Sequence, residues 1–366
     1  MPRVIGIDPG TVSIDLCGLD DGRVFLDQSL PTVEALANPA TLVGLLDAAH
    51  RAAPLDLVAG PSGYGLPLIR ARDLTERDIR LAQLTAEGET SGGIGGLGSL
   101  MRMLSRWTLP IIFTPAVMHL ASVPAHRKVN RVDMGTADKV CASVLAVHEQ
   151  AGRLECGVEE VSFIQVELGG AFTAAIAVEH GRIVDGAGGT SGPLGLRGAG
   201  ALDGEVAFLA GTVSKGLLFT GGVAAIADAS QAPAAAIADP RTPRDRLARE
   251  AYFEQVVKTV AALAVSAPDA RHVILSGRVA GLAGVRDELA RRLIGMLEGG
   301  SVHVLTGFAA VAKQAAQGAA LVADGLAGGE SAPLVEALRL REASGTVLDY
   351  LYVISQAAAR ARLGIA

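Results

Sequence analysis

Two stretches of the chain decide the fold, and they share one pattern. Residues 3–24 read RVIGIDPGTVSIDLCGLDDGRV, and residues 162–184 read SFIQVELGGAFTAAIAVEHGRIV. A shift of 159 residues places Asp8 on Glu167, Gly10 on Gly169, and the Gly-Arg pair at 22–23 on the pair at 181–182. Each copy is typical of a strand, a glycine turn with one acid, a second strand, a hairpin turn and a third strand. Two copies with equal internal spacing predict a duplicated domain.

After each copy, helical periodicity alternates with short apolar runs, which predicts α/β sheets covered on both faces. We place the boundary near residues 151–161, giving domains at 1–150 and 151–366. The expected helices are 38–51, 136–150, 244–265, 284–297, 309–326 and 333–361, and the further strands are 55–59, 111–113, 272–276 and 302–305. Residues 228–243, rich in alanine and proline, are expected to form a surface loop.

Composition excludes several classes of protein. The 366 residues are 50% hydrophobic and 19% charged, which is typical of a globular chain, and the net charge of −6 argues against nucleic-acid binding. No apolar stretch is long enough to span a membrane, and the chain starts directly in a strand pattern, so we expect a cytoplasmic protein. Three scattered cysteines form neither a disulfide framework nor a zinc site. The run Gly92–Gly98 contains a formal G-x-G-x-x-G without a preceding strand, which argues against a Rossmann site, and no P-loop occurs.

The two glycine turns carry the chemistry that the sequence suggests. Backbone N–H groups in such turns bind phosphate oxygens, and an acid at the strand end can hold Mg²⁺. For a single turn, an ordinary Asp-Pro-Gly β-turn is the simpler interpretation. The second turn, from Glu167 to Thr173, favours a site that binds phosphate and its metal. A third element, Val273–Gly281, is a buried strand that breaks at Ser-Gly ahead of a helix. Two interpretations are equally good: a surface that contacts a nucleobase or ribose, and an ordinary strand-to-helix turn.

In this order, the three elements resemble the superfamily of actin, heat-shock chaperones and sugar kinases, which includes acetate and butyrate kinases. Residues 126–139 (HRKVNRVDMGTADK) and 189–205 (GTSGPLGLRGAGALDGE) are also similar to a family catalogued as predicted butyrate kinases. The resemblance implies two duplicated ribonuclease H-like domains with a nucleotide cleft between them. The chain departs from the superfamily pattern at Glu167, where Asp is usual, and at Gly277-Arg278, where Gly-Gly is usual.

The segment from Gly135 to Lys139 resembles part of one pantothenate kinase type, in which the aspartate is a general base. Asp138 is therefore a candidate base or substrate-orienting group, and the alternative is an acid that caps a first helical turn. Arg127, Lys128 and Arg131 form a basic cluster just upstream. That cluster suits an anionic acceptor, although a solvated loop explains it equally well.

The resemblance implies an ATP-dependent phosphotransferase whose small acceptor is most simply a carboxylate such as butyrate. The implied roles are catalysis for Asp138, Arg127 and Lys128, metal binding for Asp8 and Glu167, and nucleotide binding for Asp8, Gly10, Thr11, Gly169, Gly170, Thr173, Gly277, Arg278 and Gly281. ATP and Mg²⁺ are the expected cofactors, a homodimer is kept open, and neither nucleic acid nor a membrane is expected as a partner. The alternatives are a kinase of a hydroxyl substrate and a nucleotide-driven ATPase, activator or sensor without a small-molecule acceptor.

Overall fold

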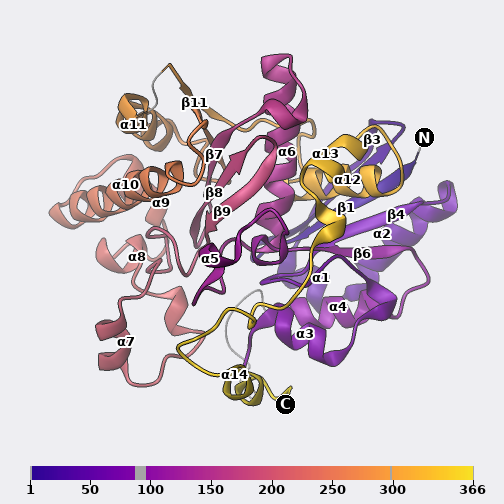
Figure 1. Cartoon of the computed structure of the whole chain (residues 1–366), viewed down its shortest axis with the longest axis horizontal. Helices are drawn as coiled ribbons and strands as arrows, with labels where there is room; N and C mark the ends of the chain where they lie inside the picture. Colours follow the sequence, from indigo (N-terminus) through magenta and orange to yellow (C-terminus); the bar gives the residue numbers. More distant parts are fainter. Residues whose placement is uncertain (1, 87–95, 297–298, 366) are drawn as a thin grey trace. The chain divides into compact units, whose positions relative to one another are not determined.

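The computed structural model describes residues 2–86, 96–296 and 299–365, and Figure 1 shows their path. Gly92–Gly95 of the glycine-rich run lie outside these residues. The chain divides into two compact units. Unit 1 comprises Met1–Val132, Thr136–Glu159 and Gly307–Ala366, and unit 2 comprises Asp133–Gly135 and Glu160–Thr306.

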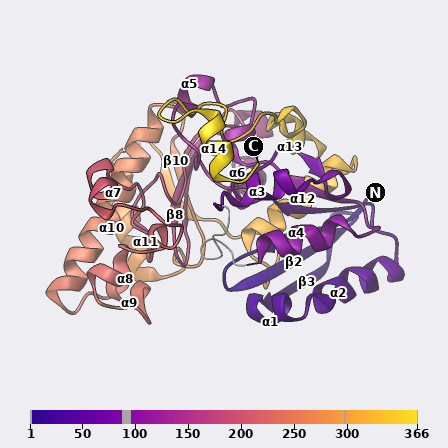
Figure 2. The same cartoon turned by 90° about the horizontal axis from the view of Figure 1, so that it is seen from below.

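Unit 1 is built on a mixed sheet with the strand order β3-β2-β1-β4-β6-β5. Its strands are β1 (Arg3–Pro9), β2 (Ser13–Asp20), β3 (Arg23–Pro31), β4 (Leu57–Pro61), β5 (Ile69–Arg70) and β6 (Ile111–Thr114). Its helices are α1 (Thr32–Ala37), α2 (Pro39–Ala52), α3 (Glu76–Gln83), α4 (Leu97–Ser105), α5 (Ala125–Lys128), α6 (Ala137–Leu154), α12 (Gln314–Leu326), α13 (Ala332–Ala337) and α14 (Gln356–Arg362). Helices α3 and α4 pack on each other (Figure 2).

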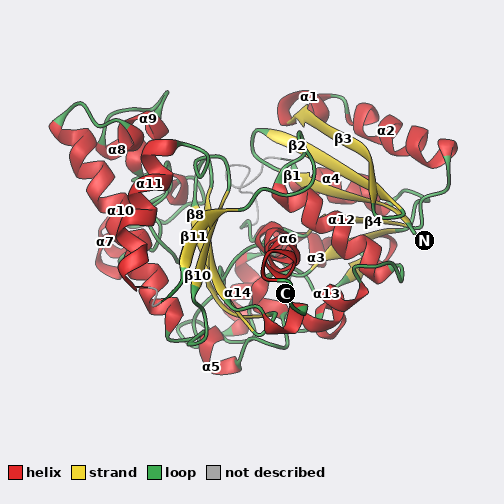
Figure 3. Ribbon diagram, turned by 90° about the horizontal axis from the view of Figure 1, so that it is seen from above, coloured by secondary structure: helices red, strands yellow, loops and turns green. Residues whose placement is uncertain are grey.

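Unit 2 repeats the order of the first five of these strands as β9-β8-β7-β10-β11, and its described residues form no counterpart of β5. Its strands are β7 (Phe163–Leu168), β8 (Thr173–Glu179), β9 (Arg182–Ala187), β10 (His272–Ser276) and β11 (Ser301–Val304). Its helices are α7 (Gly204–Ala210), α8 (Val223–Ile226), α9 (Pro233–Ala238), α10 (Pro243–Ala264) and α11 (Ala283–Leu293). Figure 3 shows α8 to α11 gathered on one side of this sheet, and the buried core of the unit includes Tyr252 and Phe253 of α10.

The duplication is confirmed by the backbone. In both units the first strand pairs antiparallel with the second and parallel with the strand that follows the first long helix. Both hairpins also carry a register irregularity, between Gly18 and Leu19 in unit 1 and between Ala177 and Val178 in unit 2. These two positions again differ by 159 residues. A recurring bulge of this kind is a conserved feature of strand geometry, so the sequence repeat is a structural repeat.

The last segment of the chain belongs to unit 1, which differs from the division at 1–150 and 151–366. Helix α12 packs against both β1 and α6. A Cβ atom on Gly6 of β1 would overlap the main-chain oxygen of Ala316, and one on Gly318 would overlap that of Cys141. These glycines allow backbones to approach closely, and the small residues of α12 thereby fix it on unit 1.

Most predicted elements are found within a few residues, with two exceptions. The expected helix at 333–361 is instead α13 and α14 with an irregular connection, in which Arg339 and Gly345 have positive φ angles of 52° and 76°. The expected loop at 228–243 contains α9, whose alanines favour a helix after Pro233. Among the described residues, none of the helices combines the length and apolar character that a membrane crossing requires.

Candidate functional site

Asp8 lies at the carboxyl end of β1, where the antiparallel register places it directly opposite Asp15 of β2. Both side chains are buried, with exposed fractions of 6% and 1%. Like charges directly opposite each other destabilise a sheet unless cations compensate them. This end of unit 1 therefore holds buried negative charge that requires a positive partner.

Two lysines supply that charge from distant parts of the sequence. The Lys313 ammonium lies 2.9 Å from a carboxylate oxygen of Asp15. The Lys139 ammonium pairs with Asp138 in the first turn of α6, and Asp138 interacts electrostatically with Asp8. We call Asp8, Asp15, Asp138, Lys139 and Lys313 the Asp8 cluster.

The two acids that the sequence singled out in unit 1 have opposite pKa shifts. Burial, followed by the charge of Asp138, raises the pKa of Asp8 to about 7, although Lys313 and Lys139 partly offset this effect. Burial also opposes ionisation of Asp138. Its pKa is nevertheless lowered, because the Lys139 charge and hydrogen bonds from Lys139 and Thr136 outweigh that burial. At neutral pH the cluster therefore holds one firmly ionised acid beside one that gains from an added cation.

The glycine turn after Asp8 is closed by its own backbone. The Gly10 N–H donates to the Ser13 carbonyl at 2.9 Å, and the Thr32 hydroxyl donates to the Gly10 carbonyl at 2.7 Å. The Thr11 N–H makes no hydrogen bond to any residue that the structure describes. Gly10 thus shapes the turn, and Thr11 offers the exposed donor.

The equivalent turn in unit 2 has the same construction. The Gly169 N–H donates to the Phe172 carbonyl at 3.0 Å, while the neighbouring Gly170 is exposed. Thr173 does not fit the predicted contact with phosphate. Its side chain is fully buried, and its hydroxyl donates to the Tyr252 hydroxyl at 3.2 Å. The strand alternation that points Thr173 into the core is the physical reason.

The structure brings Glu167 together with the predicted adenosine turn. Glu167 of β7 pairs in register with Ser276 of β10. Gly277 follows with a φ angle of 85°, and a Cβ atom there would lie 2.7 Å from the Leu168 carbonyl oxygen. The Val279 N–H donates to that same oxygen at 3.1 Å. The acid turn and the Ser-Gly turn are therefore adjacent at one edge of the sheet of unit 2, with Arg278 and Gly281 exposed beyond them.

The basic cluster upstream of α6 is less available than expected. Lys128 is 6% exposed, and its ammonium donates to the Leu120 carbonyl at 3.0 Å and lies 5.5 Å from the Tyr350 ring. Burial lowers the pKa of Lys128. Arg127 is only partly buried. Lys128 holds the C-terminal segment in place, so the predicted contact with an anionic acceptor is not supported for this residue.

The two segments that resemble the predicted butyrate kinases meet within unit 2. The Asp133 carboxylate accepts hydrogen bonds from the Thr190 N–H and hydroxyl, both at 2.9 Å. The Gly188 N–H donates to the Asp133 carbonyl, and the Ser191 hydroxyl does so as well. A single buried aspartate therefore orders the loop at 188–191.

The sequence analysis did not identify three buried or charge-compensating residues: Asp15, Lys313 and Asp133. Asp15 had a signal, since an acid in an apolar strand opposite Asp8 follows from the hairpin register. Lys313 had none, because it is 298 residues away from Asp15 in an alanine-rich stretch. The same holds for Asp133, whose partners follow it by more than 50 residues.

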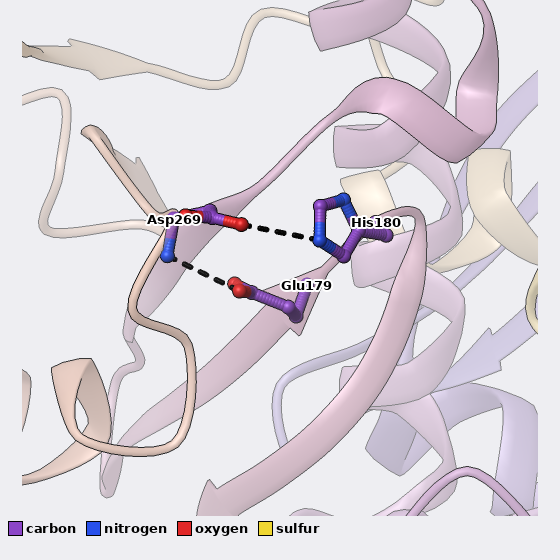
Figure 4. A group of neighbouring side chains, drawn as sticks. All are labelled: Glu179, His180 and Asp269. Atoms are coloured by element: carbon purple, nitrogen blue, oxygen red, sulfur yellow. Dashed lines mark hydrogen bonds and ion pairs between the residues drawn. The ribbon is translucent and has the colours of Figure 1, made fainter.

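Among the described residues, one group has ligand atoms close enough to hold a metal ion: Glu179, His180 and Asp269 (Figure 4). His180 pairs with Asp269 at 3.2 Å, and the Asp269 N–H donates to Glu179 at 3.1 Å. His180 and Asp269 are exposed, and the group lies at the end of β8 opposite the acid turn. Nothing beyond this acidic pairing points to an ion, so we assign no metal there.

Two sheets with this repeated order and an acid turn after each first strand define paired ribonuclease H-like units, the actin-like ATPase fold. The chain belongs to the family described as "Protein of unknown function (DUF1464)", whose match covers residues 6–353. No curated protein matches the chain in sequence.

Solved structures share the fold. A propionate kinase from Francisella tularensis subsp. tularensis SCHU S4 is similar with a TM-score of 0.64 and 12% identity, covering 87% of this chain and 98% of that chain. The acetate kinase from Entamoeba histolytica has a TM-score of 0.58 and 12% identity, covering 80% and 87%. The Porphyromonas gingivalis acetate kinase has a TM-score of 0.57 and 14% identity, covering 79% and 86%. At these identities the likeness establishes the fold alone.

Proposed function

We propose that the protein is an ATP-dependent phosphotransferase that acts on a small acceptor, with a carboxylate such as butyrate preferred. The observation that carries this proposal is the group of buried carboxylates at the carboxyl end of β1, where Asp8 lies opposite Asp15 and where Lys313 and Lys139 pair with Asp15 and Asp138. The acetate and propionate kinases that share the fold favour a carboxylate as the acceptor within this proposal. The reaction transfers the γ-phosphoryl group of ATP to a carboxylate oxygen of the acceptor and yields an acyl phosphate and ADP.

The donors around Asp8 fit Mg²⁺. The Asp8 cluster contains three carboxylates and two ammonium groups, and burial together with the Asp138 charge raises the pKa of Asp8. Magnesium prefers carboxylate oxygens and would neutralise charge on the phosphates. Asp8 would hold the ion in unit 1, and Glu167 is the corresponding candidate in unit 2. Phosphoryl transfer needs mainly positioning and charge neutralisation, so few further side chains are required.

The environment of Asp138 favours a carboxylate acceptor over a hydroxyl. A general base works best with a pKa near the working pH, whereas the pKa of Asp138 is lowered by Lys139 and Thr136. A carboxylate acceptor is ionised at neutral pH and loses no proton during attack. Asp138 then has no proton to remove, and in the structure it pairs with the Lys139 ammonium.

In unit 2 we assign the nucleotide to the edge where Glu167 and Gly277 meet. Gly170 leaves an exposed backbone for phosphate oxygens, and the turn from Gly277 to Gly281 offers an exposed surface to adenosine. Arg278 replaces the glycine that is usual in the superfamily and would contact the base or ribose.

The first test is nucleotide binding. A ligand that binds only the folded state at about 100 times its Kd stabilises the protein by about 2.7 kcal/mol, which a thermal shift detects. Asp8→Asn should remove the stabilisation by Mg-ATP and abolish turnover. Asp21→Asn is the matched control, because Asp21 is exposed in the β2–β3 turn with a φ angle of 51° that asparagine tolerates. The absence of a shift with both Mg-ATP and Mg-ADP would contradict the nucleotide assignment.

The second test is Asp138→Asn, with butyrate and hydroxyl compounds as acceptors. If the acceptor is a carboxylate, turnover should change little, because no proton has to be removed. If a hydroxyl is the true acceptor, turnover should fall by at least ~100-fold while nucleotide still binds. The second outcome would replace the carboxylate kinase with a hydroxyl kinase.

A further inference from the structure

Unit 1 contains a cavity of about 470 Å³ that includes no member of the Asp8 cluster in its lining. Its wall is formed by residues 65–69 after β4, by Thr75 at the start of α3, by Arg77, Asp78 and Leu81 within α3, by His119, and by residues 345–346. The volume lies within the range of small-molecule sites, and Leu66, Leu68, Ile69 and Leu81 give the wall an apolar part.

His119 is the polar group that the fold leaves without a partner. Its side chain is 2% exposed, and neither ring nitrogen has a hydrogen-bond partner among the described residues. Its main chain is used on both sides: the His119 N–H donates to the Ala116 carbonyl at 3.0 Å, and the Ser344 N–H donates to the His119 carbonyl at 2.9 Å. A buried polar atom without a partner is unfavourable, so a ligand that forms a hydrogen bond with the imidazole recovers that loss. Buried native groups are almost always satisfied, and one that faces a cavity is therefore informative.

The imidazole is neutral at physiological pH. Burial, followed by the Lys128 charge, lowers the pKa of His119 to about 4, and Asp349 opposes the effect only in part. A neutral ring offers one N–H donor and one lone pair to the cavity.

Arg77 is the free charge at the cavity wall. Its guanidinium is exposed and makes no hydrogen bond or ion pair with any residue that the structure describes. The neighbouring acid, Asp78, is already used, because it accepts hydrogen bonds from the N–H and hydroxyl of Thr75 at the start of α3. The Thr346 hydroxyl likewise donates to Asp349. The uncommitted groups are thus one cation and one neutral imidazole beside an apolar wall.

The cavity lies at the carboxyl ends of the parallel strands of unit 1. The segments at 65–69 and around His119 follow the carboxyl ends of β4 and β6, which run parallel to β1. Ligands of open α/β sheets bind at this edge. The Ala137 N–H at the start of α6 also donates to the Gly63 carbonyl at 2.9 Å, so the β4 loop contacts the helix that carries Asp138.

We propose that this cavity binds a small aliphatic carboxylic acid, with the chain against the leucine wall, the carboxylate at Arg77 and a hydrogen bond from His119. Binding of the acid in this cavity does not depend on the proposed kinase activity. Whether the bound acid is the phosphoryl acceptor or a regulatory ligand is decided by the experiment.

The experiment uses the full chain without nucleotide and titrates it with sodium butyrate, with butan-1-ol as the uncharged probe of equal chain length. Calorimetry should show binding of butyrate and weaker binding of the alcohol. Arg77→Gln should weaken butyrate binding by about tenfold or more, which is typical of a lost charged hydrogen bond. Arg72→Gln is the control, because Arg72 is also exposed and does not line the cavity. Equal affinities in both variants, or no binding of butyrate, would overturn the proposal.

His119 is tested by NMR of the imidazole nitrogens, which butyrate should shift in the wild type. The signal is assigned with His119→Phe. Because this buried variant can fail to fold, Leu68→Trp fills the cavity from a half-buried position instead and should also abolish binding. A His119 signal that butyrate leaves unchanged would contradict the proposal.

Addition of Mg-ATP distinguishes the two roles of the bound acid, phosphoryl acceptor and regulatory ligand. Acyl phosphate trapped as hydroxamate identifies the acceptor, whereas a changed rate of ATP hydrolysis without acyl phosphate identifies a regulatory ligand. If butyrate is phosphorylated and Arg77→Gln leaves its KM unchanged, the cavity assignment fails and the kinase stands. If Arg77→Gln abolishes butyrate binding but no variant or wild type turns over ATP, the cavity stands and the kinase fails.

Discussion

Replacing Lys313 with methionine removes the cation that faces the buried Asp15 in unit 1. The two groups lie 2.9 Å apart, Asp15 is 1% exposed, and the Lys313 side chain is 34% exposed. Within the part of the chain that the structure describes, the carboxylate would then accept a hydrogen bond from the Ser13 hydroxyl alone, at 2.8 Å. An ionised carboxylate with no cation in a buried position is strongly unfavourable, so Lys313→Met should destabilise unit 1.

The size of the effect follows from the geometry. At 2.9 Å and an effective dielectric constant of about 20, the attraction is about 6 kcal/mol before desolvation is subtracted. Breaking a buried pair costs about 3–5 kcal/mol, and because Lys313 is a third exposed we expect about 3 kcal/mol for Lys313→Met. Asp15→Asn should cost only about 1 kcal/mol, because the ammonium still reaches water and the Ser13 carbonyl at 3.4 Å. The double variant should lose about 1 kcal/mol, so the coupling energy has a magnitude of about 3 kcal/mol.

The assay is urea unfolding followed by tryptophan fluorescence. The single tryptophan, Trp107, lies in unit 1 and therefore reports that unit. Arg102→Met is the control, since Arg102 forms an exposed ion pair with Glu76 that should contribute less than about 1 kcal/mol. If the double variant is as unstable as the sum of the single variants, Asp15 and Lys313 do not compensate each other and the description of the Asp8 cluster is wrong.

Two further predictions concern unit 2. Gly277→Ala should lower the stability by more than about 2 kcal/mol and speed hydrogen exchange in β7 and β10, because the residue combines a positive φ angle with contact to the Leu168 carbonyl. Gly281→Ala, where a Cβ atom meets nothing within 4 Å, should leave both measurements unchanged, and equal effects in the two variants would refute the argument. Glu288→Gln tests the pH dependence: hydrogen bonds from Arg291 and Arg292 lower the pKa of Glu288 from 4.5 to about 2, so its stabilisation is present above pH 4.5 and is lost as the pH falls towards 2. The difference between wild type and Glu288→Gln should be about 1–2 kcal/mol at pH 6 and shrink on acidification in equilibrium unfolding, and a difference that grows on acidification would contradict this assignment.

The sequence by itself determined the repeated hairpins and the acids at their turns. Strand alternation, the glycines at the turns and the spacing between them act over fewer than 25 residues in each copy, so the pattern can be read locally. Asp8 and Glu167 were found in this way, and Gly277 was found in the separate strand and turn at 273–281; the structure places Glu167 and Gly277 side by side. Local signals also gave most helices, whereas the positive φ angles that interrupt residues 333–361 left no comparable signal.

Only the tertiary structure decided which groups compensate the buried charges and which stay without partners. Lys313 meets Asp15 because Gly6 and the alanines of α12 let that helix approach β1 closely. Lys128, which the sequence suggests for an anion, is buried under the C-terminal segment, and Thr173 turns its hydroxyl to Tyr252. His119 is isolated because elements from three parts of the chain close around it. Charge compensation and burial depend on distances in space between residues that are far apart in the chain, and no local pattern of residues specifies those distances.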